Sequence, residues 1–453
     1  MMKVDEVTSH QTVLTTLRKT GFLLDRFLKE FLRKMTFDSK FYNVFTVGLA
    51  FMLIFTGFQT AGIIEPVVLA SVSDPSFKGD GFTSLAIIYI VFAIANWIAP
   101  SFIAVCGTKV TMIIGSLSYL IFMGQFLKPM TWLLYFSSAL VGLGAPLLWT
   151  GQGTFLTDNS TPETMSRNSG LFWAMTQCSF LFGNLFVFFQ FAGQDTISDE
   201  TRVTVFSILL AVSCLGVLCL FILKSNSSER SYEPISAVTA FRKAASLAQT
   251  KNMLYLSVTF FYTGLYLGFF SIYSTAIGFT NALGESKRLV GLSGIFIGVG
   301  EVLGGTIFGI LGKKTNRHGR DPVILLGMIV HILCYFIAFI NLPNRSPHGP
   351  SDGATYISPN PYLAIFCSFL LGLGDACFNT QIYSLLGSVY SEDSSSGFAI
   401  FKFIQSVAAA VCFFYSTALD LYPQLGILGA LVLLSAWTFW KVEWSNSSSS
   451  SQL

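Results

Sequence analysis

The chain has 453 residues, of which 52% are hydrophobic and only 11% are charged, and its mean hydropathy is +0.62. Soluble domains carry about 25% charged residues, so this composition excludes a soluble protein and predicts one whose surroundings are a lipid bilayer. The net charge of +3 is small, and we expect no nucleic-acid partner.

Cysteine and histidine usage excludes further classes. The eight cysteines lie inside apolar runs and form no CxxC pair, so we expect buried free thiols and neither a disulfide scaffold nor a zinc site. The sequence shows no Ser/His/Asp set, metal-ligand cluster or nucleotide-binding loop. We therefore expect no enzyme, no cofactor and no bound metal.

Residues 1–40 form a basic, polar leader in which we expect no cleavable signal peptide. Its apolar residues share one helical face and its basic residues the opposite face: Leu24, Phe27, Leu28, Phe31, Leu32 and Met35 against Arg26, Lys29, Arg33 and Lys34. This pattern is typical of a helix lying on an anionic membrane surface. A solvated or partner-packed extension fits the same residues equally well.

Apolar segments long enough to cross a membrane follow the leader. A spanning helix needs about 20 mostly apolar residues. Twelve segments meet or approach that length: 43–72, 82–105, 110–127, 132–157, 169–192, 204–223, 253–280, 289–312, 322–341, 361–388, 397–419 and 424–441. They predict an all-α membrane protein with twelve transmembrane helices.

The segments form two sets of six around a polar linker. The predicted units are the leader 1–40, an N-terminal six-helix half 41–223, a cytoplasmic linker 224–252, a C-terminal six-helix half 253–441 and a disordered serine-rich tail 442–453. Within the linker, residues 236–249 predict a short helix along the membrane face.

The Lys and Arg residues predict that both termini are cytoplasmic, because cytoplasmic loops accumulate these residues. In this orientation six of the 27 lie outside and the other 21 lie inside. The six outer residues are Lys78, Lys128, Arg202, Lys287, Arg288 and Arg345. The opposite orientation reverses the ratio. Plasma membrane and endomembrane both remain open as the location.

Two short segments repeat across the halves. Residues 142–152 read "GLGAPLLWTGQ" and residues 372–381 read "GLGDACFNTQ". Each has Gly-x-Gly, a threonine eight positions after the first glycine and a glutamine close behind. One copy lies in the fourth span of each half, so the sequence predicts an internal six-plus-six repeat.

Residues 312–320, "GKKTNRHGR", predict a cytoplasmic hairpin between the eighth and ninth spans. They resemble the signature loop of the major facilitator superfamily, Gly-x-x-x-Asp-Arg-x-Gly-Arg, at Gly312, Arg317, Gly319 and Arg320. Asn316 stands where the aspartate is usual. We expect these arginines in the hydrated headgroup layer and the hairpin to act as an inner gate. The corresponding first-half segment "CGTK" keeps almost none of the signature.

Three segments carry a family resemblance: "AFMLIFTGFQTAG" (50–62), "SRNSGLFWA" (166–174) and "GLGDACFNTQIYSLLGSVYSEDSSSGFAIFKFIQSV" (372–407). They resemble the Unc-ninety-three-like branch of the major facilitator superfamily over residues 41–443. The resemblance implies a major facilitator fold whose first, fourth, seventh and tenth spans line a central cavity. The branch includes a potassium-channel regulatory subunit and a receptor-trafficking chaperone, so the resemblance does not assign an activity.

Two acids lie deep in the predicted membrane. Asp375 is about 21 Å and Glu301 about 18 Å from the outer ends of their spans. Ionisable residues at such depth are functional candidates, and this pair predicts a proton or ion site. The alternative is that each acid is protonated or hydrogen-bonded and holds helices together. Near the outer end of the first span, Glu65-Pro66 predicts a solvated carboxylate and the end of that helix.

Other polar residues could serve the same cavity. Lys402 is the candidate charge partner, although a depth difference of about 13 Å from Asp375 disfavours a direct pair and favours an ammonium directed to the inner interface. The candidate neutral cavity groups are Gln59, Thr60, Gln152, Thr380 and Gln381. They fit interhelical ties equally well. The glycines of the eighth span predict close helix packing, and His331 is interpreted as structural.

Only an outward-facing Asn-x-Ser/Thr site can be glycosylated. In the predicted orientation Asn344 is the one outer site, which predicts a glycoprotein, and Pro347 makes it a poor acceptor.

Two functions remain open. The first is a secondary transporter of an unidentified small solute by alternating access, with proton coupling through Asp375 and Glu301. The second is a non-transporting regulatory or trafficking subunit of another membrane protein, such as an ion channel, which the weakened gate signatures favour. Neither hypothesis specifies an oligomeric state.

Overall fold

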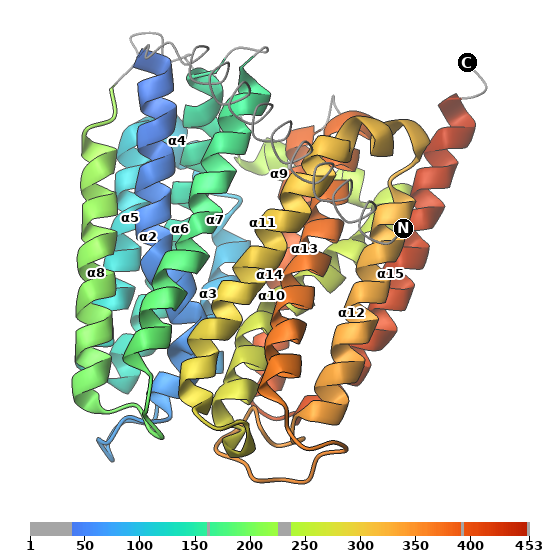
Figure 1. Cartoon of the computed structure of the whole chain (residues 1–453). Coiled ribbons are helices and arrows are strands. Elements are labelled where there is room, and N and C mark those ends of the chain that lie inside the picture. Colours follow the sequence, from blue (N-terminus) through green and yellow to red (C-terminus); the bar gives the residue numbers. More distant parts are fainter. Residues whose placement is uncertain (1–38, 161–163, 225–236, 391–393, 451–453) are drawn as a thin grey trace, which may run out of the picture.

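The computed structural model describes residues 39–160, 164–224, 237–390 and 394–450. These residues form an all-helical bundle, in which the one isolated β-bridge joins Thr280 to Ser351. Residues 1–38 of the leader, which include its predicted surface helix, lie outside the described residues. Figure 1 shows the helices of residues 39–221 on the left and most of those after residue 250 on the right.

The first group contains seven helices between residue 39 and residue 221 of the described chain. They are α2 (Ser39–Leu69), α3 (Gly81–Ala95), α4 (Ala99–Cys106), α5 (Thr108–Gln125), α6 (Thr131–Asp158), α7 (Met165–Gln190) and α8 (Asp199–Phe221). α2 packs against α7 and α8, while α5 packs against α6 and α8.

The second group follows the short helix α9 (Ala237–Ala248). It contains α10 (Lys251–Phe279), the 3-10 turn η1 (Asn281–Leu283), α11 (Ser286–His318), α12 (Asp321–Asn341), α13 (Pro361–Val389), α14 (Ser394–Ser416) and α15 (Leu421–Ser450). α10 packs against α14 and α15, while α13 packs against α11 and α12.

Ten of the described helices are long and apolar enough to cross a membrane. The predicted second span, 82–105, is bent by 67° between α3 and α4, and counting this pair as one span gives eleven. Pro100 at the start of α4 explains a break here, because proline cannot donate an intrahelical hydrogen bond. The predicted third span corresponds to α5, a helix of 18 residues.

Capping side chains fix where several helices begin at the lower end of Figure 1. Asp80 accepts a hydrogen bond from the backbone N–H of Thr83 at the start of α3, and Ser198 accepts one from Thr201 at the start of α8. Asn360 caps α13 ahead of Pro361. Such caps satisfy backbone donors that the first helical turn leaves unpaired.

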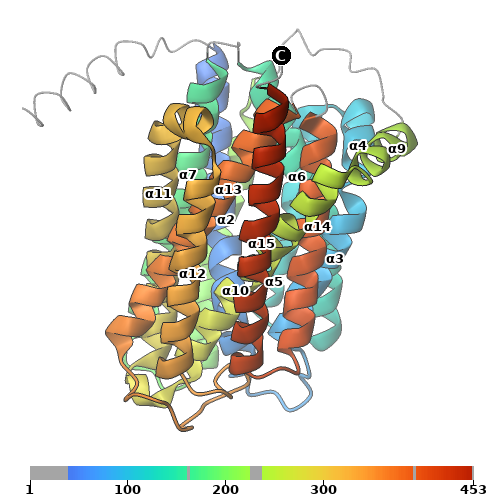
Figure 2. The ribbon, with the colours of Figure 1, turned by 90° about the vertical axis from the view of Figure 1, so that its right-hand side faces the viewer.

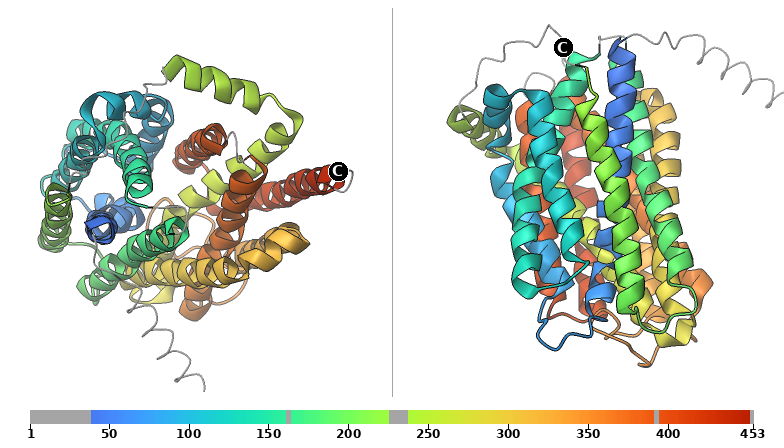
Figure 3. Two further views of the ribbon diagram at one scale, coloured as in Figure 1. Left: turned by 90° about the horizontal axis from the view of Figure 1, so that it is seen from above. Right: turned by 90° about the vertical axis from the view of Figure 1, so that its left-hand side faces the viewer.

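The described ends of the chain both lie at the upper end of the bundle, where α2 begins on the left and α15 ends on the right of Figure 1. α9 lies at the outer edge of the bundle near this upper end, as Figure 2 and the view from above in Figure 3 show. This placement confirms the short helix predicted within the linker. The tail expected to be disordered from residue 442 is helical as far as Ser450, since "KVEWSNSSSS" contains neither proline nor glycine to end the helix.

The two groups meet mainly where α7 packs against α11, α3 against α14 and α2 against α10, and α2 also contacts α11. At the lower end, a Cβ on Gly278 of α10 would lie 2.6 Å from Val290 of α11 and 3.1 Å from Val67 of α2. On α11, Gly291, Gly294 and Gly298 contact α7, whereas Gly300 and Gly304 contact α13. Glycine spacing on α11 therefore serves helix packing, as predicted.

The repeated Gly-x-Gly segments make equivalent contacts in both groups. Gly142 of α6 packs against α3 at Val91, and Gly372 of α13 packs against α11 at Ile297. The second glycine of each pair, Gly144 or Gly374, packs against the next helix, α5 or α12. Each repeat thus places the same two glycines against the second and third spans of its own group.

Candidate functional site

The two predicted acids lie together in the middle of the bundle. Glu301 on α11 is 8% exposed and accepts a hydrogen bond of 2.5 Å from Gln177 on α7. Asp375 on α13 is half-buried and accepts a hydrogen bond of 2.8 Å from Asn379, one turn further along α13. The two carboxyl groups are close enough to interact electrostatically.

Close packing of α11 against α13 brings the acids together. A Cβ on Gly372 would lie 2.0 Å from the Ile297 carbonyl oxygen and 3.0 Å from the Glu301 backbone nitrogen. A Cβ on Gly300 would lie 2.3 Å from the Phe369 carbonyl oxygen. Glycine at both crossing positions is therefore required for the backbones to approach this closely.

Behind Asp375 lies a buried set of aromatic hydroxyls around His331 of α12. Tyr262 of α10 contacts His331 Nδ1 at 2.5 Å and the Tyr335 hydroxyl at 2.9 Å. His331 Nε2 lies 3.3 Å from the Leu371 carbonyl oxygen, and its ring occupies the space left by Gly374. With both ring nitrogens engaged, His331 fits the structural role predicted for it.

Tyr266 connects this set to the acids. Its hydroxyl accepts a hydrogen bond of 3.3 Å from Asn379 and interacts with Asp375. Asn379 could have been found from the sequence, because it lies four residues after Asp375 and so on the same helical face. Gln177 and Tyr266 lie on other helices, and no local pattern marks them.

Lys402 on α14 does not pair with Asp375. Its ammonium group donates to Gln405 Oε1 at 2.9 Å and lies 4.8 Å from the ring centre of Phe401. Gln405 in turn donates to Thr263 of α10 at 3.2 Å. Lys402 is near enough to Asp375 for an electrostatic interaction, but the described residues contain no ion pair between them.

The neutral candidates differ in their surroundings. Gln59 accepts a hydrogen bond from Ser179 of α7, whereas the Thr60 hydroxyl is fully buried opposite Gly183 and makes no hydrogen bond in the described part of the chain. Thr380 donates to its own helix at Ala376. Two further glutamines, Gln152 and Gln381, are buried, and Gln381 contacts Thr380.

The predicted gate hairpin is mostly helical. α11 continues to His318, so only Gly319 and Arg320 form the turn, with Gly319 at a φ of +98°. Backbone placement is described for Gly312, Asn316 and Arg317, but their side chains lie outside the described part. The expectation that Arg320 is hydrated is wrong, because Glu443 of α15 provides a buried partner at 3.1 Å.

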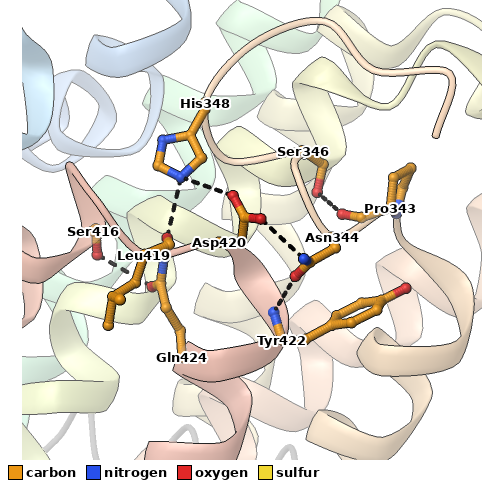
Figure 4. Close-up of polar contacts among 9 residues, drawn as sticks. All are labelled: Pro343, Asn344, Ser346, His348, Ser416, Leu419, Asp420, Tyr422 and Gln424. Atoms are coloured by element: carbon orange, nitrogen blue, oxygen red, sulfur yellow. Dashed lines mark hydrogen bonds and ion pairs between the residues drawn. The ribbon is translucent and has the colours of Figure 1, made fainter.

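Asn344 lies at the lower end, in the loop between α12 and α13 (Figure 4). Its amide nitrogen donates to Asp420 at 2.9 Å, and its amide oxygen accepts from the backbone N–H of Tyr422 at 2.8 Å. Ser346 of the same sequon is fully buried. Asn344 therefore acts as a cap for α15 in this conformation.

Solved structures similar to this chain include membrane transporters. The nucleoside transporter NupG matches with a TM-score of 0.63 at 14% identity and covers 89% of this chain and 99% of its own. The peptide transporter POT in complex with sulfate matches with a TM-score of 0.58 at 14% identity and covers 88% of this chain and 93% of its own. The protein therefore has the fold of major facilitator superfamily transporters, as predicted.

Sequence relatives give the family. The profile described as "Ion channel regulatory protein UNC-93" matches residues 76–440. "UNC93-like protein MFSD11" of Xenopus laevis is 44% identical and spans 89% of this chain and 96% of its own length. "Protein unc-93 homolog A" of Homo sapiens is 25% identical and spans 90% and 94%. The chain belongs to the UNC-93 family.

Proposed function

We propose that the protein is a secondary transporter of a small solute that works by alternating access and couples transport to protons at Glu301 and Asp375. The observation that carries the proposal is the acid pair at mid-bundle, one member of which is hydrogen-bonded across the two helix groups by Gln177. A solute or proton bound here acts on both groups at once.

The chemistry of the pair supports proton binding. Two ionised carboxylates close together in a poorly hydrated interior repel each other and lose solvation, so a shared proton or a bound cation lowers their energy. Tyr266 and Asn379 supply hydroxyl and amide groups beside Asp375 that can follow a change in its charge. Repacking of α7 against α11 then links that charge to the relative position of the two groups.

Orientation is part of the proposal. The upper end, where α2 begins and α15 ends, faces the cytoplasm, and the lower end with the loop 342–360 faces the outside. The Lys and Arg distribution supports this assignment. The first and second groups then correspond to the two six-helix halves, 41–223 and 253–441.

Uptake by the purified full-length protein in liposomes tests the function. We expect a panel of nucleosides, peptides, amino acids and organic anions to contain solutes whose uptake increases under an inward proton gradient. Asp375→Asn and Glu301→Gln should abolish this increase, while the exposed loop variant Asp352→Asn should retain it. If the proton gradient changed the uptake of no solute in the panel, the result would contradict the proposal.

A second function, regulation of an ion channel, is favoured by the description of the matched family profile. Under this alternative the protein binds another membrane protein without moving a solute. Affinity capture from native membranes would then return a stoichiometric channel partner, and Asp375→Asn would leave the captured amount unchanged.

A further inference from the structure

Glu65 on α2 is a buried acid for which the described residues provide no hydrogen bond. Its side chain is fully buried, and neither carboxyl oxygen makes a hydrogen bond within the described part of the chain. The sequence predicted a solvated carboxylate and a helix end here. Instead α2 continues through Pro66 to Leu69, which keeps Glu65 inside the bundle.

The first turn of α3 closes over this carboxyl group. A Cβ on Gly81 would lie 2.8 Å from the Pro66 Cα and 3.2 Å from the Glu65 Cγ. Ser84, one turn further along α3, is the polar side chain beside the acid, and its hydroxyl is hydrogen-bonded to Ser138 of α6 at 2.8 Å. Both serines are fully buried.

The charged groups around Glu65 do not neutralise an ionised carboxylate. Asp80, the cap of α3, adds a negative charge nearby, and its Oδ1 is already bonded to the backbone and hydroxyl of Thr83 at 2.7 Å. From α6, the Tyr135 hydroxyl accepts a hydrogen bond from the Asp80 backbone N–H.

Two buried cations at the lower ends of neighbouring helices are engaged elsewhere. Arg202 of α8 binds Asp199 and the Phe126 carbonyl oxygen. Lys287 of α11 donates to the Gly278 carbonyl oxygen at 2.5 Å. An unpaired carboxylate in such surroundings is strongly disfavoured relative to the neutral acid.

We propose that Glu65 is a proton-binding site at the lower end of the bundle, separate from Glu301 and Asp375. The carboxylate takes a proton from water at the outer surface and holds it as a carboxylic acid while α2 and α3 are packed together. When their lower ends separate, water reaches the acid and accepts the proton. The site stands whether or not the protein transports a solute.

The position of Glu65 connects it to the closure between the two groups. Val67, two residues further along α2, packs against Gly278 of α10 at the lower end. A movement that breaks this contact also displaces the α2 segment that carries Glu65. Ionisation of Glu65 should therefore favour an opened lower end, and protonation should favour the closed arrangement.

Infrared spectroscopy of the purified full-length protein tests the protonation state. At neutral pH we expect a protonated-carboxyl C=O band that Glu65→Gln removes and that the double variant Glu301→Gln/Asp375→Asn retains. Glutamine has the shape of the neutral acid, so Glu65→Gln should fold normally. If Glu65→Gln left the protonated-carboxyl C=O absorption unchanged, Glu65 would not be a proton-binding site.

Thiol labelling tests the link to opening. Val67→Cys is placed in the protein with Glu65 and in the Glu65→Gln protein, and an impermeant maleimide is applied from outside at mildly acidic and mildly alkaline pH. Because the thiol is the same in both, its own ionisation cancels in the ratio of the two rates. We expect the labelling rate of the protein with Glu65, divided by that of the Glu65→Gln protein, to rise several-fold from acidic to alkaline pH. A ratio that stays constant with pH would refute the link between Glu65 and opening.

Discussion

Gln177 of α7 donates a hydrogen bond of 2.5 Å to Glu301 of α11, so one of the two central acids is held by a helix of the other group. Nearby, the glycines of α11 let α7 approach along the same contact. The charge state of Glu301 and the packing between the groups are therefore expected to depend on each other.

Replacing Gln177 by alanine should destabilise the protein and weaken contact between α7 and α11. The change leaves a buried carboxyl oxygen without its donor, at a cost of about 1–3 kcal/mol. Thermal unfolding in detergent measures the loss, and Gln190→Ala at the end of the same helix serves as the control with little expected effect. Equal melting temperatures for both variants would show that the hydrogen bond contributes nothing.

Replacing Gly372 by alanine should be destabilising by about 1–3 kcal/mol, because the new methyl group overlaps the Ile297 carbonyl oxygen. The matched control is Gly426→Ala on α15, where no atom lies within 4 Å of the added carbon. Alanine is favoured over glycine inside a helix by about 0.5–1 kcal/mol, so the control should be neutral or stabilising. Thermal unfolding of both variants checks the sign, and a stable Gly372→Ala protein would rule out the close crossing.

Arg320 and Glu443 should show strong coupling, because they form a buried ion pair at 3.1 Å between the start of α12 and α15. Removing one partner leaves the other charge buried, at a cost of about 3–5 kcal/mol. We expect Glu443→Leu to be more destabilising than the double variant Arg320→Met/Glu443→Leu. A double-mutant cycle of unfolding free energies measures the coupling, and additive effects would contradict the pairing.

Asn344 should carry no glycan in the folded protein, because its amide is bonded to Asp420 and Tyr422 and Ser346 is buried. Glycosidase treatment should leave the electrophoretic mobility unchanged. Loss of the cap in Asn344→Ala should lower the unfolding free energy by about 1 kcal/mol. A mobility shift that disappears in this variant would mean that the loop is modified before it closes.

The sequence predicted more of the fold than of the site. The repeated Gly-x-Gly segments predicted an internal repeat, and Gly142 and Gly372 do make equivalent contacts. The sequence also placed Asp375 and Glu301 at similar depth, because rise along a helix follows from residue number alone. Their partners Gln177 and Tyr266 were missed, since each lies on a different helix and its rotation about the helix axis is set by packing.

Two local expectations are wrong because another helix packs over the residue concerned. The sequence predicts a hydrated helix end at Glu65-Pro66, but the first turn of α3 covers this acid. It predicts a headgroup residue at Arg320, but Glu443 of α15 pairs with this arginine. By itself the sequence determined that this chain crosses a membrane many times, since hydropathy is a property of each segment and its solvent, and its repeated segments predicted two related halves. Only the tertiary structure decided which buried charges are paired, shared or alone, because that depends on contacts between helices far apart in the chain.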